Sequence, residues 1–166
     1  MAIRLRLRRV LKDDLAVFFD QQLDPAANHM AAFTAKDPTD RDAFEAHWAR
    51  ILGDERITIR TIVVDDLVAG HIERFERFGQ PEISYWLGQA YWRKGIATKA
   101  LTAFLAELLE RPLYARVATD NVASIRVLEK CGFAIIGDDK GYANARGREV
   151  EEFILELDNE KRMLVA

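Results

Sequence analysis

Two cations and a glycine stand directly before an amphipathic helix: Arg93, Lys94 and Gly95 precede the helical pattern that begins at Ile96. Cations are unfavourable at the positive end of a helix dipole, where the first backbone N–H groups also lack intrahelical partners. Gly95 tolerates unusual φ values and lets a ligand approach the backbone closely. The combination predicts a site for an anion such as a phosphate or pyrophosphate. The alternative interpretation of these residues is a short glycine turn with solvated cations. The sequence contains neither a P-loop motif nor a dinucleotide-binding fingerprint.

The residue types that usually bind metals do not cluster in the sequence. His29, His47, His71 and Cys131 share no short spacing of the kind that zinc sites use, so we expect no metal. The single cysteine cannot form an internal disulfide, which favours a reducing compartment.

Length and composition fit one domain spanning residues 1–166. Hydrophobic residues make up 49% and charged residues 31% of the chain, an ordinary soluble globular mixture. The net charge of −3 gives no electrostatic reason for nucleic-acid binding. No apolar run approaches the roughly 18 residues of a membrane span, and the first ten residues lack the apolar region of a secretory signal. We therefore expect a cytoplasmic protein that binds neither nucleic acid nor a membrane.

Hydrophobic periodicity predicts a mixed α/β domain with the order β-α-α-β-β-β-α-β-α-β-β rather than a regularly alternating, doubly wound one. Residues 26–36 are expected to be an irregular connection and residues 137–149 a polar hairpin connection. The second helix should begin at an N-cap on Asp37 and end at Gly53. Four helices are expected at residues 13–24, 37–53, from 96 onward and at 121–133, and strands at 3–8, on both sides of Asp65-Asp66 within 57–78, and at 81–88, 112–120, 133–137 and 150–157.

Two motifs in this order resemble the GNAT superfamily of acetyl-CoA-dependent N-acetyltransferases. Residues 92–97 read WRKGIA and occupy the place of the family's Q/R-x-x-G-x-G/A signature, with Trp92 as a departure. The variant is similar to the YW-x-KG-x-A form of the branch that contains ribosomal-protein-alanine N-acetyltransferases, and so is the stretch NVASIRVLEKCGF at residues 121–133. The resemblance implies one N-acetyltransferase domain with a mixed, mostly antiparallel sheet of about seven strands, four helices and a splayed strand pair that holds CoA.

The resemblance also assigns the contacts with acetyl-CoA. Backbone amides of residues 93–98 would hold the pyrophosphate, and residues 85–88 would splay from the neighbouring strand to receive the pantetheine arm. An amide near Trp86 or Leu87 would polarise the thioester carbonyl as an oxyanion hole does. Asn121 would hydrogen-bond pantetheine. The alternative role for Asn121 is the N-cap of the helix that follows, although Asp120 could also cap that helix. The implied cofactor-binding residues are Trp86, Leu87, Gly88, Arg93, Lys94, Gly95, Ile96, Ala97, Thr98 and Asn121.

Acetyl transfer needs a neutral amine, and the resemblance supplies a base. Glu82 lies on its strand where several GNAT enzymes carry a catalytic glutamate, so it is the first candidate; a solvated strand-start carboxylate is the alternative. Glu73, on the preceding strand, is the second candidate, and water is a third.

The departing thiolate needs a proton. Many GNAT enzymes use a tyrosine seven residues after the asparagine, and that position is Leu128 here. In the resembling branch a serine three residues after the asparagine can serve, which gives the acid role to Ser124. A helix-start serine bonded to its own backbone is the alternative, with solvent as the acid.

The acceptor cleft of the family is walled by the first helices and their loop. Here residues 24–38 supply His29, Met30, Phe33 and Thr34, a lining with few charges that does not favour a polyamine. A peptide N-terminus or a small-molecule amine fits equally well, Tyr142 is a candidate acceptor contact, and a homodimer is compatible with the resemblance. A catalytically inactive acyl-CoA-binding regulatory domain on the same fold is the alternative function.

Overall fold

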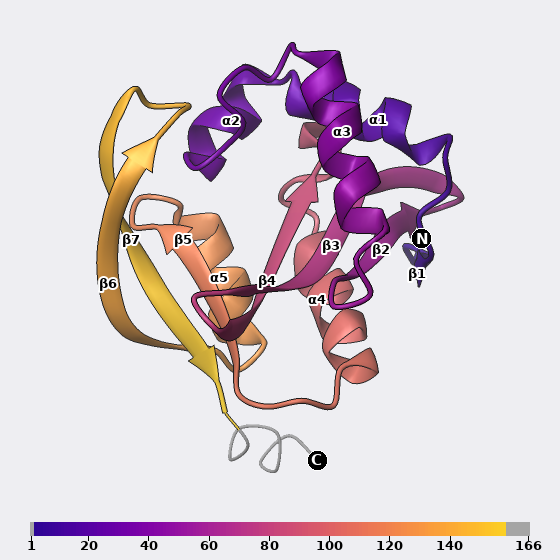
Figure 1. The fold of residues 1–166 in the computed structure, drawn as a ribbon. Coiled ribbons are helices and arrows are strands. Elements are labelled where there is room, and N and C mark those ends of the chain that lie inside the picture. Colours follow the sequence, from indigo (N-terminus) through magenta and orange to yellow (C-terminus); the bar gives the residue numbers. More distant parts are fainter. Residues whose placement is uncertain (1, 159–166) are drawn as a thin grey trace.

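The protein is described here by a computed structural model of residues 2–158, a single mixed sheet with helices on both faces (Figure 1). The sheet has seven strands in the order β1-β2-β3-β4-β5-β7-β6. Neighbouring strands are antiparallel except for the parallel pair β4 and β5. The strands are β1 (Leu5–Arg8), β2 (Thr58–Val64), β3 (Leu67–Arg77), β4 (Gln80–Leu87), β5 (Leu113–Ala118), β6 (Ala134–Ala143) and β7 (Arg148–Leu157).

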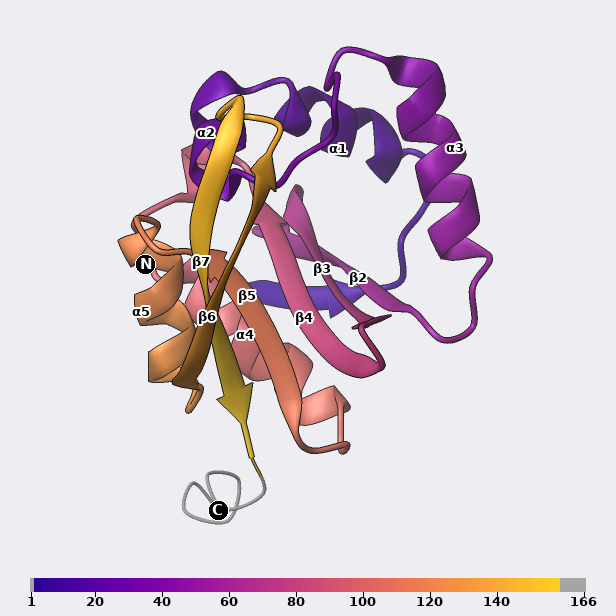
Figure 2. The ribbon, with the colours of Figure 1, turned by 60° about the vertical axis from the view of Figure 1, so that its left-hand side comes forward.

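The helices divide into two layers that bury opposite faces of this sheet (Figures 1 and 2). One layer packs through Phe18, Phe44 and Trp48, and the other through Leu101 and Phe104, all nearly inaccessible to solvent. The first layer contains α1 (Asp14–Gln22), α2 (Pro25–Ala31) and α3 (Arg41–Leu52); the second contains α4 (Ile96–Glu107) and α5 (Val122–Lys130). We call the sheet face under α1 to α3 the acceptor face and the face under α4 and α5 the cofactor face.

The parallel strands β4 and β5 separate along their length, which confirms the expected splayed pair. Their register contains one pair, Glu82 with Tyr114, whereas β5 pairs with β7 over six successive residues. Beyond this contact the strands diverge toward the carboxyl end of β4 (Figure 1). The last residues of β4 therefore have one edge that no neighbouring strand covers.

Two predictions about the first helices are wrong. The expected irregular connection contains α2, which makes five helices instead of four among the described residues; Asp24 caps it by accepting from the Ala26 N–H, and Pro25 occupies its first turn. The N-cap of α3 is Asp40 rather than Asp37. The Asp37 carboxylate instead accepts hydrogen bonds from the backbone and hydroxyl of Thr39 and forms a turn before the helix.

The strand predicted at residues 133–137 is longer than expected. β6 pairs with β7 from Ala134 opposite Glu156 to Ala143 opposite Arg148, so most of the predicted hairpin connection is strand. The polar composition of this segment reflects exposure of an edge strand rather than a loop. The turn that joins β6 to β7 is reduced to residues 144–147, and it reaches toward α2 (Figure 1).

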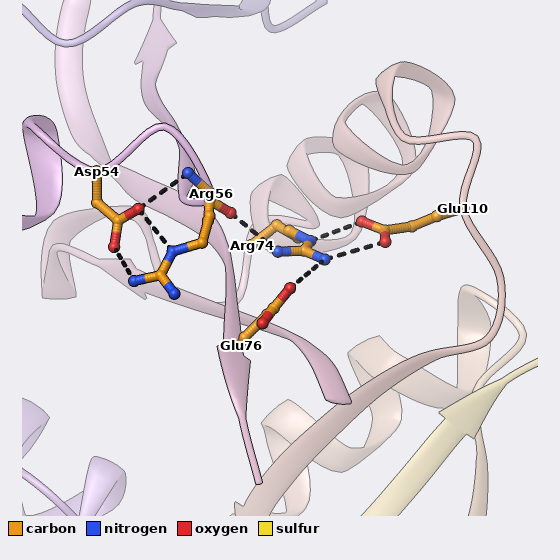
Figure 3. A network of polar contacts seen from close by, with 5 residues as sticks. All are labelled: Asp54, Arg56, Arg74, Glu76 and Glu110. Atoms are coloured by element: carbon orange, nitrogen blue, oxygen red, sulfur yellow. Dashed lines mark hydrogen bonds and ion pairs between the residues drawn. The ribbon is translucent and has the colours of Figure 1, made fainter. Parts of the chain in front are cut away.

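A polar network fixes β3 to the two connections that flank its outer end (Figure 3). Arg74 makes a bidentate ion pair with Glu110, at 2.6 and 3.0 Å, and donates to the Arg56 carbonyl at 2.9 Å. Glu76 lies 3.7 Å from the same guanidinium, and Arg56 is itself bound to Asp54. The network ties the α3–β2 connection and the segment after α4 to one strand.

Candidate active site

The turn before α4 has the open geometry that an anion site requires, and anion binding at this turn stays a prediction. Gly95 is the N-cap in the left-handed conformation, with φ +75°, and no side chain caps the helix. Arg93 also has a positive φ of 61°, and a Cβ added at Gly95 would meet nothing within 4 Å. Ile96 is buried in the core, so it can contribute only its backbone. The first-turn amides of α4 therefore face an uncovered space beside Arg93 and Lys94, which fits a pyrophosphate.

The contacts of Trp92 give a structural reason for its departure from the family signature. Its indole Nε1 donates to the Leu87 carbonyl at 2.8 Å, and its ring packs against the core of the cofactor face. This contact fastens the anion-binding turn to the end of β4, a task that the sequence pattern did not reveal.

Strand geometry decides which β4 amides are free. Gly88 N–H donates to the Ala69 carbonyl on β3, so its amide is engaged. Backbone groups of alternate residues face alternate neighbours, so the Trp86 amide also faces β3, whereas those of Leu87 and Tyr85 face the opened gap. With the Leu87 carbonyl bound to Trp92, the Leu87 N–H remains directed into the gap. Of the two amides proposed for the thioester carbonyl, geometry favours Leu87.

The start of α5 brings Ser124 to a tyrosine that sequence reasoning missed. The Tyr85 hydroxyl donates to Ser124 Oγ at 3.1 Å, and burial raises the pKa of Tyr85 despite this hydrogen bond. Alternation along β4 places Tyr85 on the cofactor face, and this alternation is the sequence pattern from which the position of Tyr85 could be predicted. Leu128, where many relatives carry a tyrosine, is buried in the core.

Asn121 acts as an N-cap in this structure. Its Oδ1 accepts from the Ser124 N–H at 3.3 Å, and its Nδ2 donates to the Met30 carbonyl at 3.2 Å. Asp120 instead forms a bidentate ion pair with Arg146, whose guanidinium is buried. The capping alternative is confirmed, and the pantetheine contact stays a prediction.

Glu82 lies in a buried ion cluster on the acceptor face. Only 3% of the residue is exposed, and Arg116 Nε is 3.4 Å from its Oε2. Arg116 also binds Glu152 at 2.9 Å and Asp139 at 3.2 Å. Burial raises the pKa of Glu82, and the attraction of Arg116 does not offset it. A raised pKa suits a base, whereas burial and the ion pair restrict access to the carboxylate.

The second carboxylate candidate has different partners. Glu73 Oε2 lies 2.8 Å from His71 Nδ1, and its Oε1 accepts from Ser84 Oγ at 2.8 Å. Sequence reasoning named Glu73 but not these two neighbours. The structure does not bring Glu73 and Glu82 into one group, because each is bound to its own partners.

The acceptor wall predicted at residues 24–38 is tied to the β6–β7 turn and to α5. Carbonyls of His29 and Thr34 accept from Arg146 Nε and Asn144 Nδ2, each at 2.7 Å, in addition to the Met30 contact described above. Phe33 packs into a small apolar cluster with Ala32, Ala118, Ala143 and Val150, whereas Tyr142 is largely exposed. These bonds tie α2 and the loop that follows it to the β6–β7 turn and to the start of α5.

Two absences concern the part of the chain that the structure describes. Residues 2–158 contain no group of three or more histidine, cysteine or acidic side chains placed to hold a metal ion. Within the same residues, no helix has the length and apolarity needed to span a membrane.

Comparison with known proteins agrees with this geometry. The Acetyltransferase (GNAT) domain family matches residues 4–134. The uncharacterized N-acetyltransferase p20 of Bacillus licheniformis is 30% identical over 83 residues, 48% of this chain and 47% of that protein, so the match spans about half of this relative.

Solved structures share the whole fold. Spermidine N-acetyltransferase from Vibrio cholerae, in complex with CoA and spermine, has a TM-score of 0.82 at 18% identity, covering 96% of this chain and 98% of that one. The ribosomal L7/L12 alpha-N-protein acetyltransferase RimL, in complex with coenzyme A, has a TM-score of 0.74 at 19% identity, covering 90% and 92%. At such identities the likeness concerns the fold. Because the family match covers most of the sequence, the chain belongs to the GNAT acetyltransferase family.

Proposed function

We propose that this chain transfers an acetyl group from acetyl-CoA to a primary amine. The observation that carries the proposal is the free edge at the end of β4, which opens beside the uncapped amino end of α4. An extended pantetheine arm can hydrogen-bond to such an edge, and a pyrophosphate can bind such a helix end.

The residues around this opening fit the parts of acetyl-CoA. Arg93, Lys94 and the amides of residues 95–98 would hold the pyrophosphate. Backbone groups of Tyr85 would bind pantetheine, and the Leu87 N–H would donate to the thioester carbonyl oxygen, where negative charge develops during attack.

The reaction is a direct transfer between two nucleophiles. The neutral amine nitrogen attacks the carbonyl carbon, the new C–N bond forms, and the C–S bond breaks. The nitrogen loses one proton and the thiolate gains one, so the products are an N-acetylated amine and CoA. An α-amine has a pKa of about 8 and a lysine amine about 10.4, so the α-amine needs less assistance at neutral pH.

Two groups on the cofactor face can supply the proton to the thiolate. Ser124 is the predicted donor, and its hydroxyl is bonded to Tyr85 at 3.1 Å. A proton passed from Ser124 could be replaced along this bond. Tyr85 thus provides from β4 the phenol that Leu128 lacks on α5.

The base is the less defined half of the mechanism. Glu82 stays the predicted proton acceptor and Glu73 the second. The raised pKa of Glu82 supports the role, and its burial beside Arg116 opposes it.

For the acceptor we propose a peptide N-terminus or a small primary amine, the two classes that the loop composition favours. The two solved structures compared above carry amine acceptors in their names, a spermidine and a ribosomal-protein α-amine. Release of CoA from acetyl-CoA, measured with N-terminal peptides, small amines and spermidine, tests the proposal. Release of CoA with at least one amine supports the proposal. If no amine in the panel causes release of CoA, the proposal is overturned.

An inactive acyl-CoA-binding domain is the second candidate, and Leu128 is the observation that favours it. Acetyl-CoA would bind such a domain and raise the melting temperature of the domain, but no amine would cause release of CoA. The Tyr85–Ser124 pair weighs against this alternative.

A further inference from the structure

His71, Glu73 and Ser84 form a hydrogen-bonded chain on the acceptor face. His71 Nδ1 lies 2.8 Å from Glu73 Oε2, and Ser84 Oγ donates to Glu73 Oε1 at 2.8 Å. Both carboxylate oxygens are therefore engaged. A carboxylate only accepts hydrogen bonds, so Nδ1 carries the hydrogen, and Nε2 of the neutral ring is left as the acceptor.

The imidazole ring is held in one place and its Nε2 is reachable. Its centroid lies 4.8 Å from the Phe18 ring and 4.9 Å from the Trp48 ring, both at steep interplanar angles. The His71 side chain is 14% exposed, and Nε2 is not among the buried polar atoms that lack a partner in the described residues. A basic nitrogen that is not completely shielded from solvent is thus held in place while a carboxylate orients the ring.

Of the three candidate bases His71, Glu73 and Glu82, His71 lies nearest along the sheet to Leu87. It is the cross-strand partner of Trp86, and the Cα atoms of such a hydrogen-bonded pair lie about 5.5 Å apart. Leu87 follows Trp86 directly. Glu82 is five residues from Leu87 on an extended strand, about 17 Å at roughly 3.4 Å per residue. Along the sheet, the Cα atom of Glu82 therefore lies much farther from Leu87 than that of His71.

The two proton-transfer groups then occupy opposite faces of β4. Tyr85 packs with the core of the cofactor face and contacts Ser124, whereas His71 packs between rings of α1 and α3. An amine that attacks from the acceptor face would meet His71 on its own side, and the sulfur would leave toward Ser124.

We propose that His71 Nε2 accepts the proton that the acceptor amine loses, with Glu73 and Ser84 as positioning residues. The inference rests on the proposed function. One N–H bond of the amine breaks, the proton moves to Nε2, and the imidazolium charge is balanced by Glu73. The proton later returns to solvent, and no oxidant or further reactant is needed.

Several charged groups surround this ring and must be separated from it in a pH experiment. From α3, His47 has its pKa lowered by burial and then by Arg50. From α1, Asp14 is bound to Arg8 of β1 and to Thr61, the β2 partner of His71. Glu73 is the remaining neighbour. His47→Gln is therefore the matched control, since it removes the nearby histidine that does not belong to the hydrogen-bonded chain of His71, Glu73 and Ser84.

The test is the pH profile of kcat/KM for an amine that the parent acetylates. We expect His71→Gln to lower kcat/KM about 100-fold at neutral pH, the usual contribution of one positioned base, and to reduce the acidic limb to the part set by ionisation of the amine itself. Glu73→Gln should lower it about tenfold and shift that limb, since a positioning carboxylate also supports the imidazolium. His47→Gln should keep the parent profile. All three variants should keep the rise in melting temperature with acetyl-CoA.

A second readout does not depend on turnover. Diethyl pyrocarbonate acylates an accessible neutral imidazole, and peptide mass spectrometry would locate the adduct. His71 should be modified in the parent and protected by acetyl-CoA. Absence of modification at His71, or a parent-like pH profile in His71→Gln, would overturn this inference while leaving the proposed function intact. A parent that acetylates no amine would overturn the proposed function and this role together.

Discussion

The two faces of β4 present different kinds of polar group, backbone amides on one face and side chains on the other. On the cofactor face, the site proposed for acetyl-CoA consists of backbone amides at the start of α4 and along the free strand edge, with Gly95 opening the turn and Trp92 fastening it to β4. On the acceptor face, the polar groups of the proposed proton-transfer chain are side chains from two strands: His71 and Glu73 on β3, and Ser84 on β4. One face is defined by a contiguous turn, the other by cross-strand register.

This difference predicts which changes each face tolerates. A backbone site is lost only when a substitution alters chain conformation or fills the approach to the amides. A side-chain site is lost with a single functional group, although the fold around it persists. Substitutions on the two faces should therefore separate acetyl-CoA binding from acetyl transfer.

The largest expected effect is on the helix layer of the acceptor face. Asp14 is buried and accepts from Arg8 at 2.7 and 3.0 Å, from the Leu11 N–H and from Thr61. Burial by itself would raise the pKa of Asp14, but these hydrogen bonds outweigh it and leave the pKa below its ordinary value. Asp14→Asn should lower the unfolding free energy by about 3 kcal/mol at neutral pH, the usual result of breaking a buried pair.

The pH dependence of this loss has a definite sign. Because the folded pKa is depressed, the stabilisation is present above the ordinary carboxyl value of about 3.9 and is lost as pH falls through the folded value. Denaturant unfolding from pH 7 down to pH 3 should show the two proteins converging. Asp13→Asn, at an exposed neighbouring position, is the control. A difference that stays constant with pH would contradict the ion-pair explanation.

The contrast between the faces also decides what the sequence could predict. The glycine turn at Gly95 and the presence of seven strands follow from local patterns, and the structure contains both, although β6 extends beyond its predicted end. The partners of Glu73 are not predicted, although the two-residue hairpin turn at Phe78-Gly79 fixes the register that places Ser84 opposite Glu73. The register set by that turn indicates Ser84, whereas His71 follows from alternation along β3, which places residues 71 and 73 on the same face.

Longer-range contacts had no local signal. Arg116 reaches Glu82 across a parallel pair that a helix separates in sequence, and nothing near either residue indicates the contact. The sequence does not predict α2, because a proline directly after the expected helix at residues 13–24 is typical of a helix end; in the structure Pro25 opens a new helix capped by Asp24.

The next effect concerns the backbone site. Gly95→Val should abolish the stabilisation by acetyl-CoA, about 2.7 kcal/mol at a hundredfold excess over Kd, because the branched side chain disfavours positive φ and fills the approach to the amides. Gly79 has the same φ of 75° and equally open surroundings in the β3–β4 turn. Gly79→Val is therefore a matched control for strain, and it should keep the response in melting temperature. Equal responses in both variants would mean that the phosphate site lies elsewhere.

Loss of the proton donor should follow. Ser124→Ala should slow single-turnover acetyl transfer by up to about 100-fold while acetyl-CoA still binds, and by less if water substitutes. Tyr85→Phe should produce a smaller loss through the same hydrogen bond. A parent rate in Ser124→Ala would mean that solvent protonates the thiolate and that the serine only begins a helix.

The smallest effect is expected at Glu82. Glu82→Gln should lower turnover by about tenfold or less, with little change in acetyl-CoA affinity, and the loss should shrink as rising pH supplies more free amine. It should also be smaller than the loss in His71→Gln at the same pH. A loss that does not vary with pH, or no loss, would remove Glu82 from the base role.

The central claim, that the free edge of β4 is the acetyl-CoA site, is tested most directly at two adjacent amides. Residue-resolved hydrogen exchange by NMR, with and without acetyl-CoA, compares the Leu87 N–H, which faces the gap, with the Trp86 N–H, which is directed toward β3. Binding should slow exchange at Leu87 and in the first turn of α4 and leave Trp86 nearly unchanged. Acetyl-CoA that binds without protecting the Leu87 amide would contradict the account.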